Sequence, residues 1–97
     1  MPGYIQLLKV TQQGAANWKA APGDMRLGKA EAEKIGIRNI GFWVTMGEYD
    51  VVAIWDAPDD QTMAAFALAA ASRGDIATQT MRAFSDEEFA QIVSKLP

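Results

Sequence analysis

Four short stretches of the chain combine apolar, β-branched and aromatic residues in the way that is typical of β-strands, and turn-forming residues bound most of them. The expected strands are residues 4–10, 40–46, 49–56 and 75–84. Only Gly47 and Glu48 separate the second strand from the third. A two-residue loop with glycine first is typical of a type II′ hairpin turn, so these two strands are expected to pair antiparallel.

The expected turn sets which residues of the hairpin face each other. Val44 pairs with Val51 and Thr45 with Asp50 in this register. One face then carries Ile40, Phe42, Val44, Met46, Tyr49, Val51, Ala53 and Trp55, and the other carries Gly41, Trp43, Thr45, Asp50, Val52, Ile54 and Asp56. Both faces contain bulky apolar side chains, so both are expected to need cover from water.

Three further stretches repeat apolar residues at helical spacing, at 25–36, at 61–74 and from Ser85 onward. The sequence also marks their ends. Pro22 is expected in the first turn of the first helix, and Gly36 closes that helix. Asp59 or Asp60 caps the start of the second helix, and Gly74 closes it. Ser85 and Glu88 form a capping box at the start of the third. The predicted apolar stripes are Met25, Gly28, Ala32 and Ile35; then Met63, Phe66, Ala67, Ala70 and Ala71; then Phe89, Ile92, Val93 and Leu96.

This order of elements predicts an α+β protein with the ferredoxin-like split βαβ fold, in one domain that spans residues 1–97. Right-handed crossovers place the two long helices on one face of a four-stranded antiparallel sheet, and the C-terminal helix is short. The second face is expected to stay apolar and uncovered. A homodimer that packs sheet against sheet would cover it.

Composition removes several classes of function. The net charge is −3, the isoelectric point is about 4.7, and the nine Lys and Arg residues are scattered, so no nucleic-acid partner is expected. The chain has no Cys and no His, which excludes thiolate chemistry, His-dependent triads and the commonest metal ligands. We expect no cofactor and no metal. Without a signal-like N-terminus or a long apolar run, we also expect a cytoplasmic protein with no membrane partner.

The stretch 45-TMGEYDVVAIWDAPDD-60 resembles the signature of the GYD domain family, which is named for its Gly-Tyr-Asp core. The opening 4-YIQLLKVTQQGAAN-17 looks like the family's first strand and Thr-x-x-Gly turn, and 64-AAFALAAASRGDIATQTMRAFS-85 follows its usual course. Residues 18–40 depart from the pattern. The resemblance implies a dimeric α/β barrel related to the ferredoxin-like fold, in a family whose members are largely uncharacterised.

Six side chains are candidates for binding a ligand: Trp18, Arg26, Trp43, Tyr49, Asp50 and Arg82. Four of them also have a structural interpretation. Asp50 is expected to pair with Thr45 or with backbone N–H groups, and Tyr49 to pack over Met46. Adjacent strand residues point to opposite faces, so Tyr49 and Asp50 are not expected to serve one pocket together. Trp43 is more typical of a core or an interface. Arg82 either faces solvent or, on an internal face, needs a carboxylate partner such as Asp50.

Two functions are consistent with these features. The first is a small homodimeric protein that binds a small organic molecule in an apolar cavity between the sheet and the helices. The second is an oligomerisation or interaction module with neither ligand nor catalysis. An enzyme built from this chain would be limited to cofactor-free proton transfer by Asp, Tyr or Arg.

Overall fold

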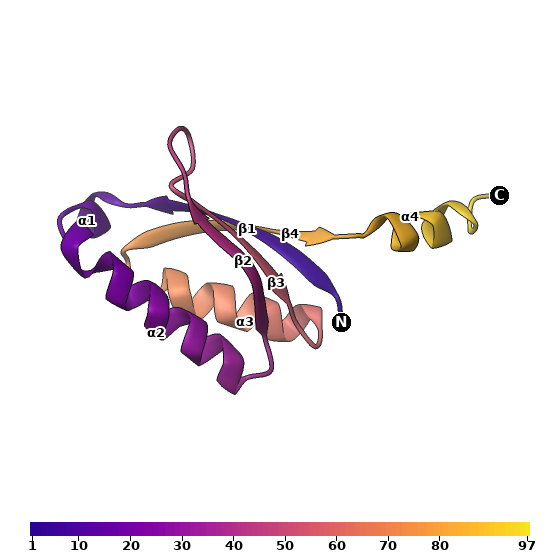
Figure 1. Cartoon of the computed structure of the whole chain (residues 1–97), viewed down its shortest axis with the longest axis horizontal. Coiled ribbons are helices and arrows are strands. Elements are labelled where there is room, and N and C mark those ends of the chain that lie inside the picture. The colour runs from indigo at the N-terminus through magenta and orange to yellow at the C-terminus, as the bar shows by residue number, and fades with distance from the viewer.

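Four antiparallel strands form one sheet, and two long helices cover one of its faces (Figure 1). The computed structural model describes residues 1–97. The elements are β1 (Gly3–Val10), α1 (Gln12–Ala15), the 3₁₀ turn η1 (Trp18–Ala20), α2 (Ala21–Lys34), β2 (Arg38–Val44), β3 (Val51–Asp56), α3 (Asp60–Ala71), β4 (Ile76–Ala83) and α4 (Asp86–Val93). The strand order β2-β3-β1-β4 is consistent with the ferredoxin-like plan that the sequence predicts.

The covered face of the sheet, called the inner face below, holds the core. Alternate residues of β1 and β3 are buried, and the cross-strand pairs Tyr4–Trp55 and Leu8–Val51 lie on this face. Met63 from α3 packs against the same cluster. The register settles which face of the hairpin is internal, because Val51 and Trp55 are buried whereas Trp43 is 54% exposed on the opposite side.

The hairpin between β2 and β3 keeps the predicted register but not the predicted turn. Val44 pairs with Val51 as expected, and the Thr45 N–H donates to the Asp50 carbonyl over 2.8 Å. Regular pairing ends there, so the two-residue turn at Gly47 and Glu48 was a wrong prediction and residues 45–50 form a longer loop.

Contacts with neighbouring strands explain this longer loop. The Asp50 carboxylate accepts from the Val10 N–H over 2.8 Å, and the Tyr49 hydroxyl donates to Oε1 of Gln79 over 2.9 Å. These bonds direct both residues toward β1 and β4 rather than back toward Met46, which is fully exposed. Tyr49 therefore does not pack over Met46 as the sequence suggested.

The predicted helix signals are largely confirmed. Pro22 lies in the first turn of α2, and Gly36 and Gly74 take positive φ angles of 83° and 84° where α2 and α3 end. Asp59 caps α3, because its carboxylate accepts from the Thr62 N–H over 2.7 Å. The capping box at the start of α4 is also present. Helix α2 begins four residues earlier than predicted because η1 leads directly into it.

The predicted burial of the C-terminal helix is wrong. Phe89 and Leu96 are 61% and 67% exposed, and Ile92 and Val93 are exposed as well. Figure 1 shows the reason: the chain leaves the sheet at the end of β4, and α4 lies beyond that end, away from the other helices and strands. Ile35 is exposed too, and Ile37, just past the helix, takes the buried place.

The turn after β1 requires a glycine for close packing. Thr11 caps α1 by accepting from the Gly14 N–H over 3.2 Å, and its own hydroxyl donates to the Gly74 carbonyl over 2.6 Å. A Cβ atom added at Gly14 would lie 2.2 Å from the Asp75 carbonyl oxygen. The Thr-x-x-Gly sequence therefore holds the start of β4 against the end of β1.

We predict that Gly14→Ala lowers the free energy of unfolding by about 1–3 kcal/mol, because the added methyl group overlaps backbone that cannot move freely. Gly28→Ala is the matched control, since a Cβ there meets nothing within 4 Å. That substitution lies inside α2 and should instead stabilise the protein by up to about 1 kcal/mol. Urea unfolding followed by circular dichroism measures both. Equal effects of the two substitutions would contradict the packing argument.

Candidate functional site

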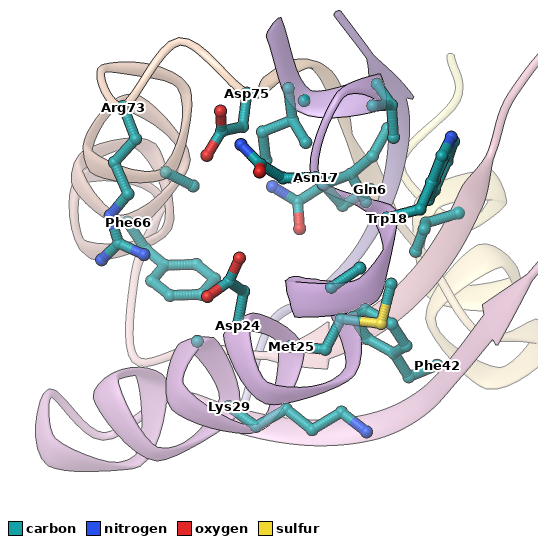
Figure 2. Close-up of a pocket in the computed structure, with 18 of the residues that line it drawn as sticks. Gln6, Asn17, Trp18, Asp24, Met25, Lys29, Phe42, Phe66, Arg73 and Asp75 are labelled. Carbon is teal, nitrogen blue, oxygen red and sulfur yellow. The ribbon is translucent and has the colours of Figure 1, made fainter.

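A cavity of about 230 Å³ lies between the inner face of the sheet and the helices α2 and α3. Its walls are mainly apolar, and Trp55 and Phe66 meet there edge to face with ring centroids 5.1 Å apart. Phe42 and Met25 lie on the α2 side, as Figure 2 shows. The cavity has the place that the sequence suggested for one, between sheet and helices.

Gln6 supplies the one deeply buried polar group of this cavity. Its side chain comes from the centre of β1 and is 2% exposed. Its Oε1 accepts from the Trp55 indole N–H over 3.0 Å, whereas its Nε2 has no hydrogen-bond partner in the chain. Sequence reasoning missed this residue. The available signal was a polar side chain that alternates in register with Tyr4 and Leu8 in the mainly apolar stretch 4-YIQLLKV-10.

Charged and polar side chains surround the opening of the cavity. Asp24 and Asp75 direct their carboxylates toward it in Figure 2. Asp75 accepts a hydrogen bond from Gln13 over 3.0 Å, while Asp24 makes no hydrogen bond or ion pair. The two nearby cations are engaged elsewhere. Arg73 pairs with Glu31 over 2.6 Å, and Lys29 Nζ lies 4.5 Å from the centroid of the Phe42 ring.

A second polar cluster lies at the other end of β1, outside the cavity. The Tyr4 hydroxyl donates to Oδ1 of Asp60, and the Arg82 guanidinium lies 4.0 Å from the same oxygen and 3.7 Å from Glu88. Burial, together with the Asp60 hydrogen bond, raises the pKa of Tyr4 to about 12. Arg82 is thus on the inner face and its partners are Asp60 and Glu88. The suggested partner Asp50 is wrong.

The GYD segment itself has structural roles. Asp50 extends the β1–β3 pairing with its carboxylate, because its backbone N–H donates to the Leu8 carbonyl while its side chain accepts from Val10. Thr45 donates its hydroxyl to the Tyr49 carbonyl over 2.6 Å. These hydrogen bonds hold Asp50 against β1 and Thr45 against the loop, and neither residue lines the cavity.

The six candidate residues do not form one site. Trp18, half exposed on η1, lines the cavity, and it is the only one of the six that does so. Arg26 is exposed on α2. Trp43 and Tyr49 belong to the side of the sheet opposite the helices, and Arg82 joins the Tyr4 cluster. Most of the other residues that line the cavity come from α2, α3 and the inner face of the sheet. None of them was singled out from the sequence as a candidate for binding a ligand.

The three aspartates near the start of α3 are also separated by their contacts. Asp56 pairs with Arg38 over 3.1 Å, Asp59 caps the helix and Asp60 accepts from Tyr4. No group of three or more acidic side chains is arranged to hold a metal ion. None of the helices combines the length and the apolar character that crossing a lipid bilayer requires.

Comparison with known proteins identifies the relatives of this chain. The model of the GYD domain family matches residues 4–93. A Thermus thermophilus protein named glutamine synthetase and cystathionine beta-lyase binding protein is 33% identical over 84 residues, which cover 86% of this chain and 88% of the relative. No solved structure matches the chain.

We predict that the protein loses stability as the pH rises from about 10 to about 12, because of Tyr4. The folded-state pKa of Tyr4 is about 12, above its value of 10.0 in an unfolded chain. The folded state therefore keeps a proton that the unfolded state releases in this window, and its advantage disappears as the pH approaches 12.

Ultraviolet absorbance of tyrosinate, together with urea midpoints at several pH values, measures this effect. Tyr4→Phe should remove the late titration and flatten the loss of stability. Tyr49→Phe is the control, because it leaves Tyr4 as the one remaining tyrosine. A Tyr49→Phe protein whose single tyrosine ionised near pH 10 would show that the Tyr4–Asp60 bond does not hold the phenol proton.

Proposed function

Because this chain belongs to the GYD domain family, we propose that it acts as a homodimeric protein-interaction module whose partners include metabolic enzymes. The observation that carries this proposal is the large apolar surface that a single copy leaves exposed. The argument begins with the face of the sheet that no helix covers, called the outer face below.

The outer face of the sheet carries apolar side chains on all four strands, with Lys9 and Gln79 as polar residues among them. Cross-strand pairs on this face include Leu7–Val52 and Ile5–Ile54. The edge strands add Trp43 on β2 and Met81 on β4. Trp43 lies flat, since a Cβ added at Gly41 would meet the indole ring 2.3 Å away. A flat apolar surface of this kind on one face of an antiparallel sheet supports binding to another protein surface.

The exposed area of the chain supports the presence of a partner. The chain exposes 6610 Å², whereas a monomeric protein of 10.5 kDa is expected to expose about 5,400 Å². The excess is about 1,200 Å², and each partner in a standard interface contributes roughly 800 Å². The radius of gyration, 14.7 Å, also exceeds the roughly 12.5 Å expected for this length.

Helix α4 accounts for part of this excess and favours a second copy as the partner. Phe89, Ile92, Val93 and Leu96 lie at the i, i+3, i+4 and i+7 positions by which amphipathic helices bind an apolar surface. The helix projects beyond its own sheet (Figure 1). A two-fold dimer that stacks the outer faces would cover both sheets and bring each projecting helix within reach of the other copy.

The class of heterologous partner comes from the Thermus thermophilus relative, whose name states that it binds glutamine synthetase and cystathionine beta-lyase. With 33% identity over most of both chains, a shared interaction role is the simplest inference for this protein.

We predict that the protein is a dimer of about twice 10.5 kDa and that Ile54→Glu makes it a monomer. Ile54 lies near the middle of the outer face, where an unpaired carboxylate in the stacked interface would be strongly unfavourable. Light scattering after gel filtration measures the mass, and circular dichroism checks that the variant is folded.

Leu27→Glu is the matched control for this substitution. Leu27 is exposed on α2, on the far side of the sheet, so the same new charge should leave the dimer intact. A wild-type protein that stayed monomeric at micromolar concentration would overturn the dimer, and dissociation by both substitutions would show that the outer face is not the specific interface.

We also predict that the immobilised wild-type protein retains purified glutamine synthetase from the same source organism in a direct binding assay. Bovine serum albumin serves as the protein control at the same concentration. Surface plasmon resonance gives the affinity. Absence of binding to both glutamine synthetase and cystathionine beta-lyase would remove the proposed enzyme partners while leaving the dimer prediction intact.

A further inference from the structure

We propose that the cavity beneath the inner face binds a small aromatic amine, of one or two rings, whose buried end carries a hydrogen-bond acceptor. This site is separate from the outer face and does not depend on the proposed interaction role. Three features of the cavity carry the inference: the free amide nitrogen of Gln6, the size and aromatic character of the walls, and the carboxylates at the opening.

The orientation of the Gln6 amide is fixed by its neighbour. The Trp55 indole nitrogen can only donate, so the amide oxygen must face it, as the 3.0 Å bond shows. The amide nitrogen then points away from the Trp55 indole. Figure 2 shows the Gln6 side chain among the residues that line the cavity. A donor that is 98% buried and has no partner in the chain is unfavourable until an acceptor meets it.

A second unpaired group, the Thr80 hydroxyl, lies next to Gln6. Thr80 faces Gln6 across the β1–β4 pair, and its hydroxyl also has no partner. No hydrogen bond joins the two side chains, and Thr80 does not line the cavity. The Gln6 nitrogen therefore has no hydrogen-bond partner within the chain.

The dimensions and walls of the cavity select an aromatic ligand. A volume of about 230 Å³ is below the roughly 300–1,000 Å³ of pockets for drug-sized molecules, and an apolar cavity of about 150 Å³ holds benzene. One or two fused rings therefore fit. Trp55, Phe66 and Phe42 offer ring faces and edges against which a flat molecule can pack.

The opening selects the charge of the ligand. Asp24 has no partner and Asp75 has only the neutral Gln13 amide, so both carboxylates can face a cation. Arg73 is already paired with Glu31 and Lys29 lies over Phe42, so an anion would compete with an existing partner at each of them. A ligand with an ammonium group at its outer end is thus favoured over one with a carboxylate.

Isothermal titration calorimetry with three matched probes tests the proposal on the intact wild-type protein. The first is a quinoline with an aminomethyl group on the ring that lacks the nitrogen. The second is the corresponding aminomethylnaphthalene, which lacks the acceptor, and the third is the quinoline carboxylate, which reverses the charge. We expect the quinoline amine to bind roughly five- to tenfold more tightly than the naphthalene, because one buried hydrogen bond distinguishes them.

Variants then locate the site. Gln6→Met keeps the length of the side chain but removes the donor, so it should abolish the preference for quinoline over naphthalene. Thr80→Val is the matched control and should keep that preference. Gly28→Leu places a side chain where the cavity is open and should abolish binding of all probes without loss of helix stability. Asp24→Asn should reduce the advantage of the amine over the carboxylate.

Several outcomes would overturn the proposal. The wild-type protein could fail to bind any probe, or it could bind quinoline and naphthalene amines equally. Unchanged binding by Gly28→Leu would place the probes outside the cavity. Should Gln6→Met not fold, the comparison of the two amines on the wild-type protein still decides whether an acceptor is recognised. None of these outcomes affects the dimer, whose interface lies on the opposite face of the sheet.

Discussion

The sheet is apolar on both faces, but the chain provides helices for only one of them, and the other features of the molecule follow from this constraint. Alternation along β1 and β3 sends Tyr4, Leu8, Val51 and Trp55 toward the helices. The residues between them are also apolar and remain without cover. Antiparallel sheets ordinarily place polar residues on such a face. Here the sequence retains apolar residues on that face, and this is the observation on which the proposed homodimer rests.

The same inner face explains why a cavity remains within so small a core. The helices carry small residues opposite the sheet, including Ala21, Gly28 and Ala70, which line the cavity and cannot fill it. Only a few aromatic side chains span the space. Gln6 adds a polar group at the floor, held in one orientation by Trp55. Small residues on the helices and one fixed amide on the sheet together produce a cavity that is apolar but has one directional contact.

The sequence was sufficient to predict the fold because local signals and the overall plan agree. Gly36, Gly74, Asp59 and the Ser85–Glu88 pair each mark an element end, and the structure places ends at or next to all of them. The predictions failed where the outcome depends on contacts distant in sequence. The loop at 45–50 is set by β1 and β4, and the exposed α4 reflects the path of the chain beyond the sheet. No local pattern encodes either contact.

The candidate site shows the same limit more strongly. Trp18 was named as a candidate from the sequence, and it does line the cavity, although its side chain remains half exposed. Gln6 was missed because a polar residue in a strand looks like an ordinary outward position, as Lys9 of the same strand is. The family signature was informative about fold rather than chemistry. The Asp50 carboxylate accepts from the backbone of β1, and the Tyr49 carbonyl accepts from Thr45 within the loop. A motif can therefore identify a family through the residues that hold a turn together, while the residues that face a ligand lie on strands and helices that the motif does not include.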